Sequence, residues 1–255
     1  MVGHQDAVDD TRDVRDVPPR GSARQIPREI TMTVSEDRLV RKWSGGGMSR
    51  VYDFTIQHEI FYRLLSRMVW GADARPFYAG LAALRDVPTG SSVLDVPCGG
   101  GVAFRGLSPD AAIRYVAADA SPYMLRRAEA EAARRGLEGI EYVHTVVEQM
   151  PFDEATFDLC VSYHGLHCFA DPPAALAEMA RVTRPGGELR GTVVVTDGGA
   201  LSRAAISFFR RVDQFGTVGS TDDIVGWLTD AGFAELQVDR QGAYLFFSAR
   251  RVAAK

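Results

Sequence analysis

The chain has 255 residues, of which 46% are hydrophobic and 24% charged, and its formal net charge is −4. These values are typical of a soluble globular protein, and the charge gives no overall attraction to nucleic acid or anionic lipid, although a local basic patch is compatible with it. No apolar run approaches the roughly 18 residues that a membrane helix needs, and the first twenty residues lack a signal-peptide pattern. The three cysteines have no CxxC spacing, which predicts neither a disulfide framework nor a metal site. We therefore expect a cytoplasmic protein that does not insert into membranes.

Residues 1–42 differ in composition from the rest of the chain. They contain no Phe, Tyr or Trp, and aspartates alternate with arginines before Pro18-Pro19. Such a segment buries too little apolar area to offset the entropy lost on ordering. We expect a disordered, functionally quiet tail, and the alternatives are a functional arm or a start codon placed too early.

Residues 43–88 follow as an expected helical cap. After Trp43 and a run of glycines, the apolar residues from Ile60 to Val69 recur at three- and four-residue spacing, which predicts an amphipathic helix. A second, short helix is expected over residues 76–84.

From residue 89 to 255, strands and helices alternate. The predicted strands cover residues 92–96, 113–118, 140–146, 157–163 and 189–196, and residues 234–241 and 243–250 predict a hairpin at Gly242. Helices begin at Ser121-Pro122 and Asp171-Pro172, where a capping side chain precedes a proline. This order predicts an α/β fold with a Rossmann-like, doubly wound, seven-stranded, mostly parallel sheet that ends in an antiparallel hairpin.

The segment after the first of these strands carries the clearest functional signal. The strand leads into Pro97-Cys98-Gly99-Gly100-Gly101, and Asp119 ends the second strand. Glycines let the backbone approach a ligand, and a carboxylate at the second strand end can accept hydrogen bonds from both ribose hydroxyls of a nucleoside. The pattern predicts a nucleoside site, and the alternative is a structural turn followed by an ordinary helix-flanking aspartate.

Five passages, in order, resemble the class I S-adenosylmethionine (SAM) dependent methyltransferases, in particular small-molecule enzymes such as those of quinone pathways. The passages are 93–101, 115–119, 148–159, 165–172 and 184–187. The resemblance extends over about residues 48–250 and implies that residues 43–255 form one SAM-dependent methyltransferase domain with SAM as cofactor.

The resemblance also implies contacts with the cofactor. Asp95, with the backbone of Cys98 and Gly99, would face the methionine part of SAM, and Asp119 would hold the ribose. The other implied positions are Pro97 and Gly101 in the loop, Ala120, Met124, Val147 and Glu148 around the adenine, Tyr163 and His164 beside the methionine amino group, and Tyr52 closing over the cofactor.

Two residues depart from the family pattern. Pro97 stands where family members usually have glycine, and proline lacks one backbone N–H. Val146 stands where the family often has an aspartate that contacts the adenine amino group. Losing such a bond costs about 1.5–3 kcal/mol, on the order of ten- to a hundredfold in affinity.

His167 and His164, just after the fourth strand, are the candidate catalytic residues. Methyl transfer mainly requires alignment of the acceptor, and a base is needed only where the acceptor loses a proton. A histidine near its ordinary pKa can serve as that base at neutral pH. The alternative for both histidines is that they only shape the pocket.

The expected function is methyl transfer from SAM to carbon or oxygen of a small, fairly hydrophobic acceptor. Aromatic residues of the cap and of the segment after the fifth strand are expected either to line an apolar pocket or to pack helices on the sheet. No nucleic-acid partner is expected, because the paired arginines fit solvated helix faces. The alternatives are a SAM- or nucleoside-binding regulator or scaffold without methyl transfer, and a nicotinamide-dependent oxidoreductase, which needs a GxGxxG spacing that this loop lacks. The acceptor and the oligomeric state stay open.

Overall fold

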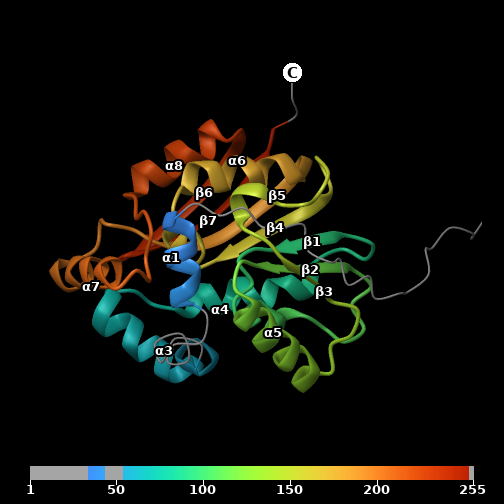
Figure 1. Cartoon of the computed structure of the whole chain (residues 1–255), viewed down its shortest axis with the longest axis horizontal. Coiled ribbons are helices and arrows are strands. Elements are labelled where there is room, and N and C mark those ends of the chain that lie inside the picture. Colours follow the sequence, from blue (N-terminus) through green and yellow to red (C-terminus); the bar gives the residue numbers. More distant parts are fainter. Residues whose placement is uncertain (1–33, 44–53, 253–255) are drawn as a thin grey trace, which may run out of the picture.

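A single sheet of seven strands organises the computed structural model, which describes residues 34–43 and 54–252 (Figure 1). The strand order is β3-β2-β1-β4-β5-β7-β6. The strands are β1 (Ser92–Asp95), β2 (Arg114–Asp119), β3 (Glu141–His144), β4 (Phe157–Tyr163), β5 (Thr183–Val194), β6 (Phe233–Gln241) and β7 (Tyr244–Arg251). The predicted seven-stranded sheet is therefore confirmed.

The first five strands are parallel, and β7 runs antiparallel to both β5 and β6. Gly242 has a left-handed φ of 57° and makes the turn of the predicted hairpin. The strand order reverses between β1 and β4, and ligands of open α/β sheets bind beside such a switch point, at the carboxyl ends of the strands.

Helices cover both faces of the sheet (Figure 1). On one face lie α6 (Pro172–Val182) and α8 (Thr221–Asp230); on the other lie α4 (Arg75–Ala82) and α5 (Pro122–Arg135). Successive side chains of a strand point to opposite faces, so Val93 packs in the core cluster under α4 and α5, and Leu94 in the cluster under α6 and α8. Two apolar cores therefore hold the sheet between them.

The predicted helix starts are confirmed by their capping bonds. Ser121 Oγ accepts from the N–H of Met124 at 3.3 Å, and Asp171 Oδ1 accepts from the N–H of Ala174 at 3.0 Å. Both helices then begin with proline, which needs no N–H partner in the first turn. The first of these caps fixes the start of α5 directly after Asp119.

The expected disorder of residues 1–42 is wrong for α1 (Val34–Lys42), which is helical. Asp37 and Arg41 form an i,i+4 ion pair on this helix, with 2.5 Å between Arg41 Nη2 and Asp37 Oδ2. Residues 1–33 lie outside the described residues. The folded part of the chain therefore starts before the expected boundary at residue 43.

The cap helices lie where the sequence predicts them. However, the first cap helix buries a different face from the one that its apolar spacing indicates. The first consists of α3 (Glu59–Leu65) and a π-helical turn, η1 (Ser66–Trp70). Tyr62, Ser66 and Trp70 are buried, whereas Ile60 and Leu64 are exposed. Aromatic packing explains the difference, because Tyr62 stacks on Tyr244 of the sheet and Trp70 packs against the same ring at a tilt.

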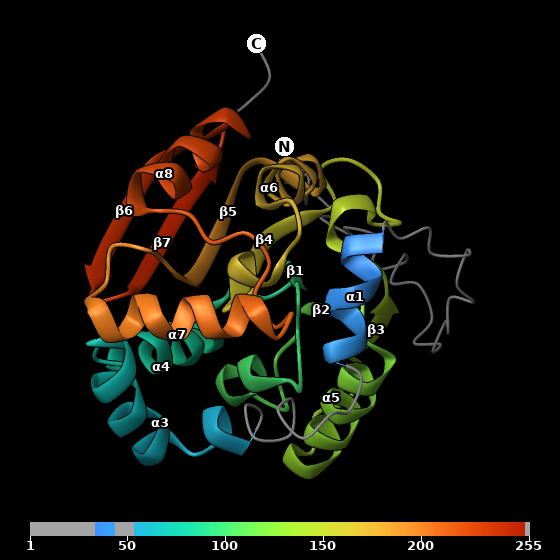
Figure 2. The ribbon, with the colours of Figure 1, turned by 60° about the vertical axis from the view of Figure 1, so that its left-hand side comes forward.

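The remaining helical elements are short turns and one further helix. The turns are η2 (Ala83–Asp86), η3 (Val102–Gly106), η4 (Val147–Gln149) and η5 (Leu166–Cys168). The further helix, α7 (Ala200–Arg211), follows β5 and lies beside the cap (Figure 2). No helix among the described residues has the length and apolar character to cross a membrane.

Candidate functional site

A pocket opens at the carboxyl ends of the parallel strands, beside the switch point. Its wall combines α1 and Trp43 with the segments that follow β1, β2, β3 and β4. The predicted site residues in this wall are Pro97, Cys98, Gly99, Asp119, Ala120, Met124, Val147, Glu148, Tyr163 and His164. Asp95, Gly101 and His167 do not line it, and Tyr52 lies outside the described residues.

The glycine-rich loop after β1 shapes the floor of the pocket. Gly99 has a φ of 52° and Gly101 a φ of 78°, which is backbone geometry that side chains disfavour. The N–H of Gly99 donates to Asp119 Oδ2 at 2.9 Å. A Cβ on Gly101 would lie 2.7 Å from the Phe104 ring and 3.3 Å from Ala128 Cα. Gly99 therefore belongs to the pocket, whereas Gly101 lets the loop pack on α5.

Asp119 is the polar centre of the wall. Its Oδ1 accepts from the N–H of Ser121 at 2.8 Å while Oδ2 accepts from Gly99, so both carboxylate oxygens are fixed. Burial raises the pKa of this carboxyl to about 6, and the two N–H groups counteract that rise. At pH 7 the group is ionised and has lone pairs left to accept hydrogen bonds from a pair of hydroxyls.

Asp95 occupies a different environment at the neighbouring strand end. Its side chain is 1% exposed, and Oδ2 accepts from the Tyr115 hydroxyl at 2.9 Å. Burial raises the pKa of Asp95 to about 8, so the carboxyl holds its proton at pH 7. The implied contact of Asp95 with the methionine part of SAM stays a prediction.

Both departures from the family pattern supply apolar wall. Pro97 packs against Gly165, where an added Cβ would lie 2.3 Å from Pro97 Cδ. Val146 lines the pocket after β3, between Thr145 and Val147. Thr145 Oγ1 donates to the carbonyls of Val146 and Gln149, both at 3.1 Å, which fixes this segment.

His164 links the pocket to a buried network of hydroxyl groups. It has a left-handed φ of 57°, and its Nε2 lies 2.8 Å from the Tyr62 hydroxyl. That hydroxyl lies 2.8 Å from the Tyr244 hydroxyl, which in turn lies 3.3 Å from Ser66 Oγ. Burial lowers the pKa of His164 to about 3, so the imidazole is neutral at pH 7.

His167 is placed differently from His164. Its Nδ1 accepts from the N–H of Val194 at 3.2 Å, and its ring packs edge-on against Phe215, with 4.5 Å between centroids. Burial, reinforced by His164, holds the pKa of His167 well below its ordinary value. This bonding supports the end of β5, and a role as base stays a prediction without a pocket contact.

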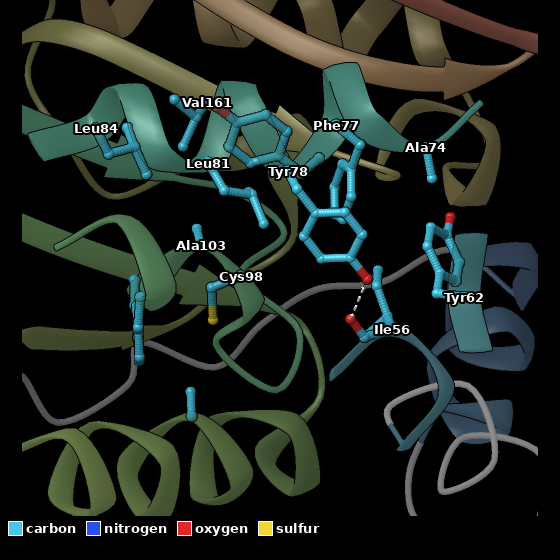
Figure 3. Packing of buried hydrophobic residues seen from close by; sticks show 14 of the residues in the cluster. Ile56, Tyr62, Ala74, Phe77, Tyr78, Leu81, Leu84, Cys98, Ala103 and Val161 are labelled. Carbon is cyan, nitrogen blue, oxygen red and sulfur yellow. Dashed lines mark hydrogen bonds between the residues drawn. The ribbon is translucent and has the colours of Figure 1, made fainter. Parts of the chain in front are cut away.

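Sequence reasoning missed the apolar residues that close the pocket. These are Leu39, Val40 and Trp43 from the N-terminal side, Ile56 before α3, Cys168 at the end of η5, and Phe169 and Ala170 after it. Ile56 is held by the Tyr78 hydroxyl, which donates to its carbonyl at 2.9 Å (Figure 3). A usable signal existed for α1, because acidic residues precede and basic residues follow a short apolar core in the run from Ser35 to Lys42.

Comparison with known proteins matches this geometry. Residues 94–190 match the family model described as a methyltransferase domain. The phthiotriol/phenolphthiotriol dimycocerosates methyltransferase of Mycobacterium leprae is 35% identical over 105 residues, which are 40% of this chain and 37% of that protein. The demethylmenaquinone methyltransferase of Clavibacter sepedonicus is 36% identical over 103 residues, 39% of this chain and 40% of that protein. These matches span less than half the length of either relative.

The fold has solved counterparts. The phosphoethanolamine N-methyltransferase 2 of Haemonchus contortus, solved in complex with S-adenosyl-L-methionine, aligns with a TM-score of 0.66. The alignment covers 87% of this chain and 61% of that chain at 16% identity. At this identity the likeness shows the fold alone.

Proposed function

We propose that this chain, whose residues 94–190 match the methyltransferase-domain family model, transfers a methyl group from SAM to carbon or oxygen of a small, fairly hydrophobic acceptor. The observation that carries the proposal is the Asp119 carboxylate. It stands in the pocket wall at the end of β2, with both oxygens fixed by backbone N–H groups and with a left-handed glycine turn beside it. This arrangement suits the ribose of a nucleoside better than a phosphate, because a carboxylate repels anions.

The pocket residues fit the parts of SAM. Asp119 would accept hydrogen bonds from the ribose hydroxyls. Ala120, Met124 and Val147 offer apolar surface to a flat base, and the backbone at Cys98 and Gly99 is open to close approach. When bound, SAM supplies an electrophilic methyl group on a positively charged sulfur.

The acceptor class is inferred from the apolar part of the pocket wall. Leu39, Trp43, Ile56 and Phe169 line the pocket with apolar side chains. Such a wall favours an acceptor with a hydrophobic body, and methyl transfer then depends on holding it in line with the methyl group.

His164 is the proposed proton acceptor for acceptors that must lose a proton. It is the histidine of the pocket wall, and it is neutral at pH 7. Because burial lowers its pKa to about 3, it would take the proton only as the acceptor oxygen bonds to the methyl group and its hydroxyl becomes strongly acidic. When its proton is on Nε2 and is donated to Tyr62, Nδ1 is left as an acceptor. The hydroxyls of Tyr62 and Tyr244 then orient the ring.

We also propose a cytoplasmic location. Cys98, Cys160 and Cys168 are all thiols, and Cys98 and Cys160 are buried. Unpaired thiols are typical of reducing compartments. Activity of the protein in a cytosolic extract that contains its acceptor would support this location.

Calorimetric titration of the full chain with SAM and with S-adenosylhomocysteine (SAH) tests the cofactor. We expect one site of micromolar affinity that weakens on the order of ten- to a hundredfold in Asp119→Asn, since charge-assisted hydrogen bonds contribute about 1.5–3 kcal/mol. Asp230→Asn, at the exposed end of α8, is the matched control and should bind as the unaltered chain does.

Consumption of SAM separates the enzyme from a binding protein. The full chain is incubated with methyl-labelled SAM and hydrophobic phenols or quinols, and label in the organic extract is counted. Transfer supports the proposal. Tight binding of SAM with no transfer to any member of a broad acceptor panel would favour a regulator or scaffold, and binding of a reduced nicotinamide cofactor in place of SAM would overturn the proposal.

A further inference from the structure

Two neighbouring elements expose large apolar side chains on the outside of the cap. In α3–η1, Ile60 is 85% exposed, Met68 65%, Leu64 59% and Phe61 52%. In α7, Leu201 and Phe208 are at least half exposed. Trp70 of η1 stacks on Phe209 of α7 at 6.2 Å between centroids, so the two elements are in contact, and Figure 2 shows them on the same side of the molecule. We call these six exposed residues the cap face.

Clustered exposure of this kind is unusual in a monomeric protein. Single exposed apolar residues are common, but a patch built from several large side chains on adjacent elements marks a surface that contacts something apolar. On α3–η1 the exposed residues recur at four-residue spacing at positions 60, 64 and 68, which aligns them along one side of the helix. The opposite side carries the buried Tyr62 and Ser66.

Arginines lie on the same two elements. Arg63 and Arg67 follow the exposed stripe, and the Arg67 side chain is 66% exposed. The segment of α7 contains Arg203, Arg210 and Arg211 and no carboxylate. Glu59 and Asp73 are the carboxylates that pair with Arg63 and Arg67, at 3.7 Å and 3.5 Å. The two elements are therefore net basic in a chain whose net charge is −4.

We propose that the cap face docks peripherally on an anionic lipid bilayer. A helix with apolar residues on one side and arginines at its border lies in the interface, with its apolar side chains among the acyl chains and its cations at the headgroups. A second copy of the chain fits less well, because a two-fold interface would bring the same arginines of both copies together.

The position of the cap face relative to the pocket gives this docking a use. The inward side of α3 carries Tyr62, whose hydroxyl lies 2.8 Å from His164 Nε2 in the pocket wall. One helix thus separates the pocket from the proposed bilayer. Here the inference rests on the proposed function: a hydrophobic acceptor dissolved in the bilayer would reach the pocket past this helix.

Co-sedimentation with vesicles tests the docking without any activity measurement. The full chain is mixed with vesicles of phosphatidylcholine alone or with added phosphatidylglycerol. We expect binding to the phosphatidylglycerol vesicles that decreases with salt, and a partition coefficient lowered about tenfold or more in the triple variant Ile60→Gln, Leu64→Gln, Met68→Gln, since each side chain loses its apolar insertion. The exposed residues tolerate these changes without loss of core packing.

Two further variants make the result specific. Val238→Gln alters a half-exposed apolar residue on the edge strand β6, away from the cap, and should bind vesicles unchanged. Arg67→Gln with Arg211→Gln should weaken binding to phosphatidylglycerol vesicles and reduce its salt dependence. Circular dichroism spectra of all variants establish that they are folded.

Three outcomes would overturn the proposal. The first is no sedimentation of the folded chain with phosphatidylglycerol vesicles at low salt. The second is equal loss of binding in Val238→Gln and in the triple variant. The third is a stable dimer in light scattering that the triple variant dissociates, which would assign the cap face to self-association. If instead the proposed function is wrong, the chain would bind the vesicles but would not bind SAM.

Discussion

Asp95 and Asp119 end neighbouring strands, yet they present different chemical groups. Asp119 stands at the pocket with two backbone N–H groups on its oxygens, and Asp95 is turned to Tyr115 inside the core. The sequence places both carboxyls at strand ends, because an apolar run that stops at an acid is visible in one dimension. It does not show which groups each carboxyl meets. Alternation points both side chains to the same face of the sheet, and their difference comes from their partners, the Tyr115 hydroxyl for Asp95 and backbone N–H groups for Asp119.

The pKa of Asp119 predicts how nucleoside binding depends on pH. Since burial raises this pKa to about 6, the carboxyl loses its charge as the pH falls through 6. We expect the affinity for SAH to fall below pH 6 by at most about tenfold per pH unit, because one proton competes with the ribose. Calorimetry from pH 5 to pH 8 measures this. Asp119→Asn should bind SAH weakly and with an affinity that does not change with pH. If the affinity of the unaltered chain were also independent of pH, Asp119 would not be the residue that binds the ribose.

Substitutions of the two histidines are expected to have different effects. His164→Asn preserves the left-handed backbone, which asparagine tolerates, and removes the imidazole from the pocket. For a phenolic acceptor we expect kcat to fall by about a hundredfold or more, the usual contribution of a general base, with SAH affinity nearly unchanged. Steady-state kinetics and calorimetry measure the two quantities.

His167→Leu is the matched control for that pair. It leaves the buried N–H of Val194 without its acceptor, which costs about 1–3 kcal/mol of unfolding free energy. We expect lower stability in urea titration and a kcat close to that of the unaltered chain. A larger loss of kcat in His167→Leu than in His164→Asn would reverse the assignment of the base.

At the scale of elements, the alternation of strands and helices was predictable from the sequence. Which face each cap helix buries was not. The central strands follow from apolar runs of strand length, the polar strand β6 from the hairpin turn at Gly242, and α5 and α6 from their caps and prolines. The face that α3 buries was not predictable from spacing, because Tyr62 and Trp70 are drawn inward by Tyr244, a residue 182 positions after Tyr62. Similarly, α1 was not predicted, because its few apolar residues lie within the predominantly polar segment of residues 1–42.

The helix α1 is expected to contribute to binding rather than to stability. Leu39 lines the pocket but belongs to neither core cluster. Leu39→Asn should therefore weaken SAH binding about tenfold, since the loss of one apolar contact is worth about 1.5 kcal/mol, and leave the unfolding midpoint unchanged. Arg38→Gln, on the exposed side of the same helix, is the control. Equal affinity in both variants would show that α1 is dispensable for the pocket.

At the scale of the whole molecule, one sheet separates two apolar cores, and the Asp95 carboxyl is buried on the side of the core under α4 and α5, beside Tyr115. Both core clusters were foreseeable as a class, because the central parallel strands β1, β2 and β4 are apolar on both faces, as parallel strands covered by helices must be. The free-energy cost of burying the Asp95 carboxyl was not foreseeable from the sequence. It depends on the complete exclusion of water, which only the assembled layers produce.

Asp95 is therefore expected to couple global stability to pH. Its folded pKa of about 8 lies above the unfolded value of 3.8, so between these pH values the native state holds a proton that the unfolded state releases. Stability contributed by this group is full below pH 4 and decreases as the pH rises toward 8, with a limiting slope of about 1.4 kcal/mol per pH unit. Asp95→Asn cannot ionise, and its amide oxygen can still accept from Tyr115. Urea titrations between pH 5.5 and pH 8, at steps on the order of half a pH unit, measure this. The free energy of unfolding should decline less with pH in Asp95→Asn than in the unaltered chain. Parallel curves would mean that the carboxyl is ionised in the native core.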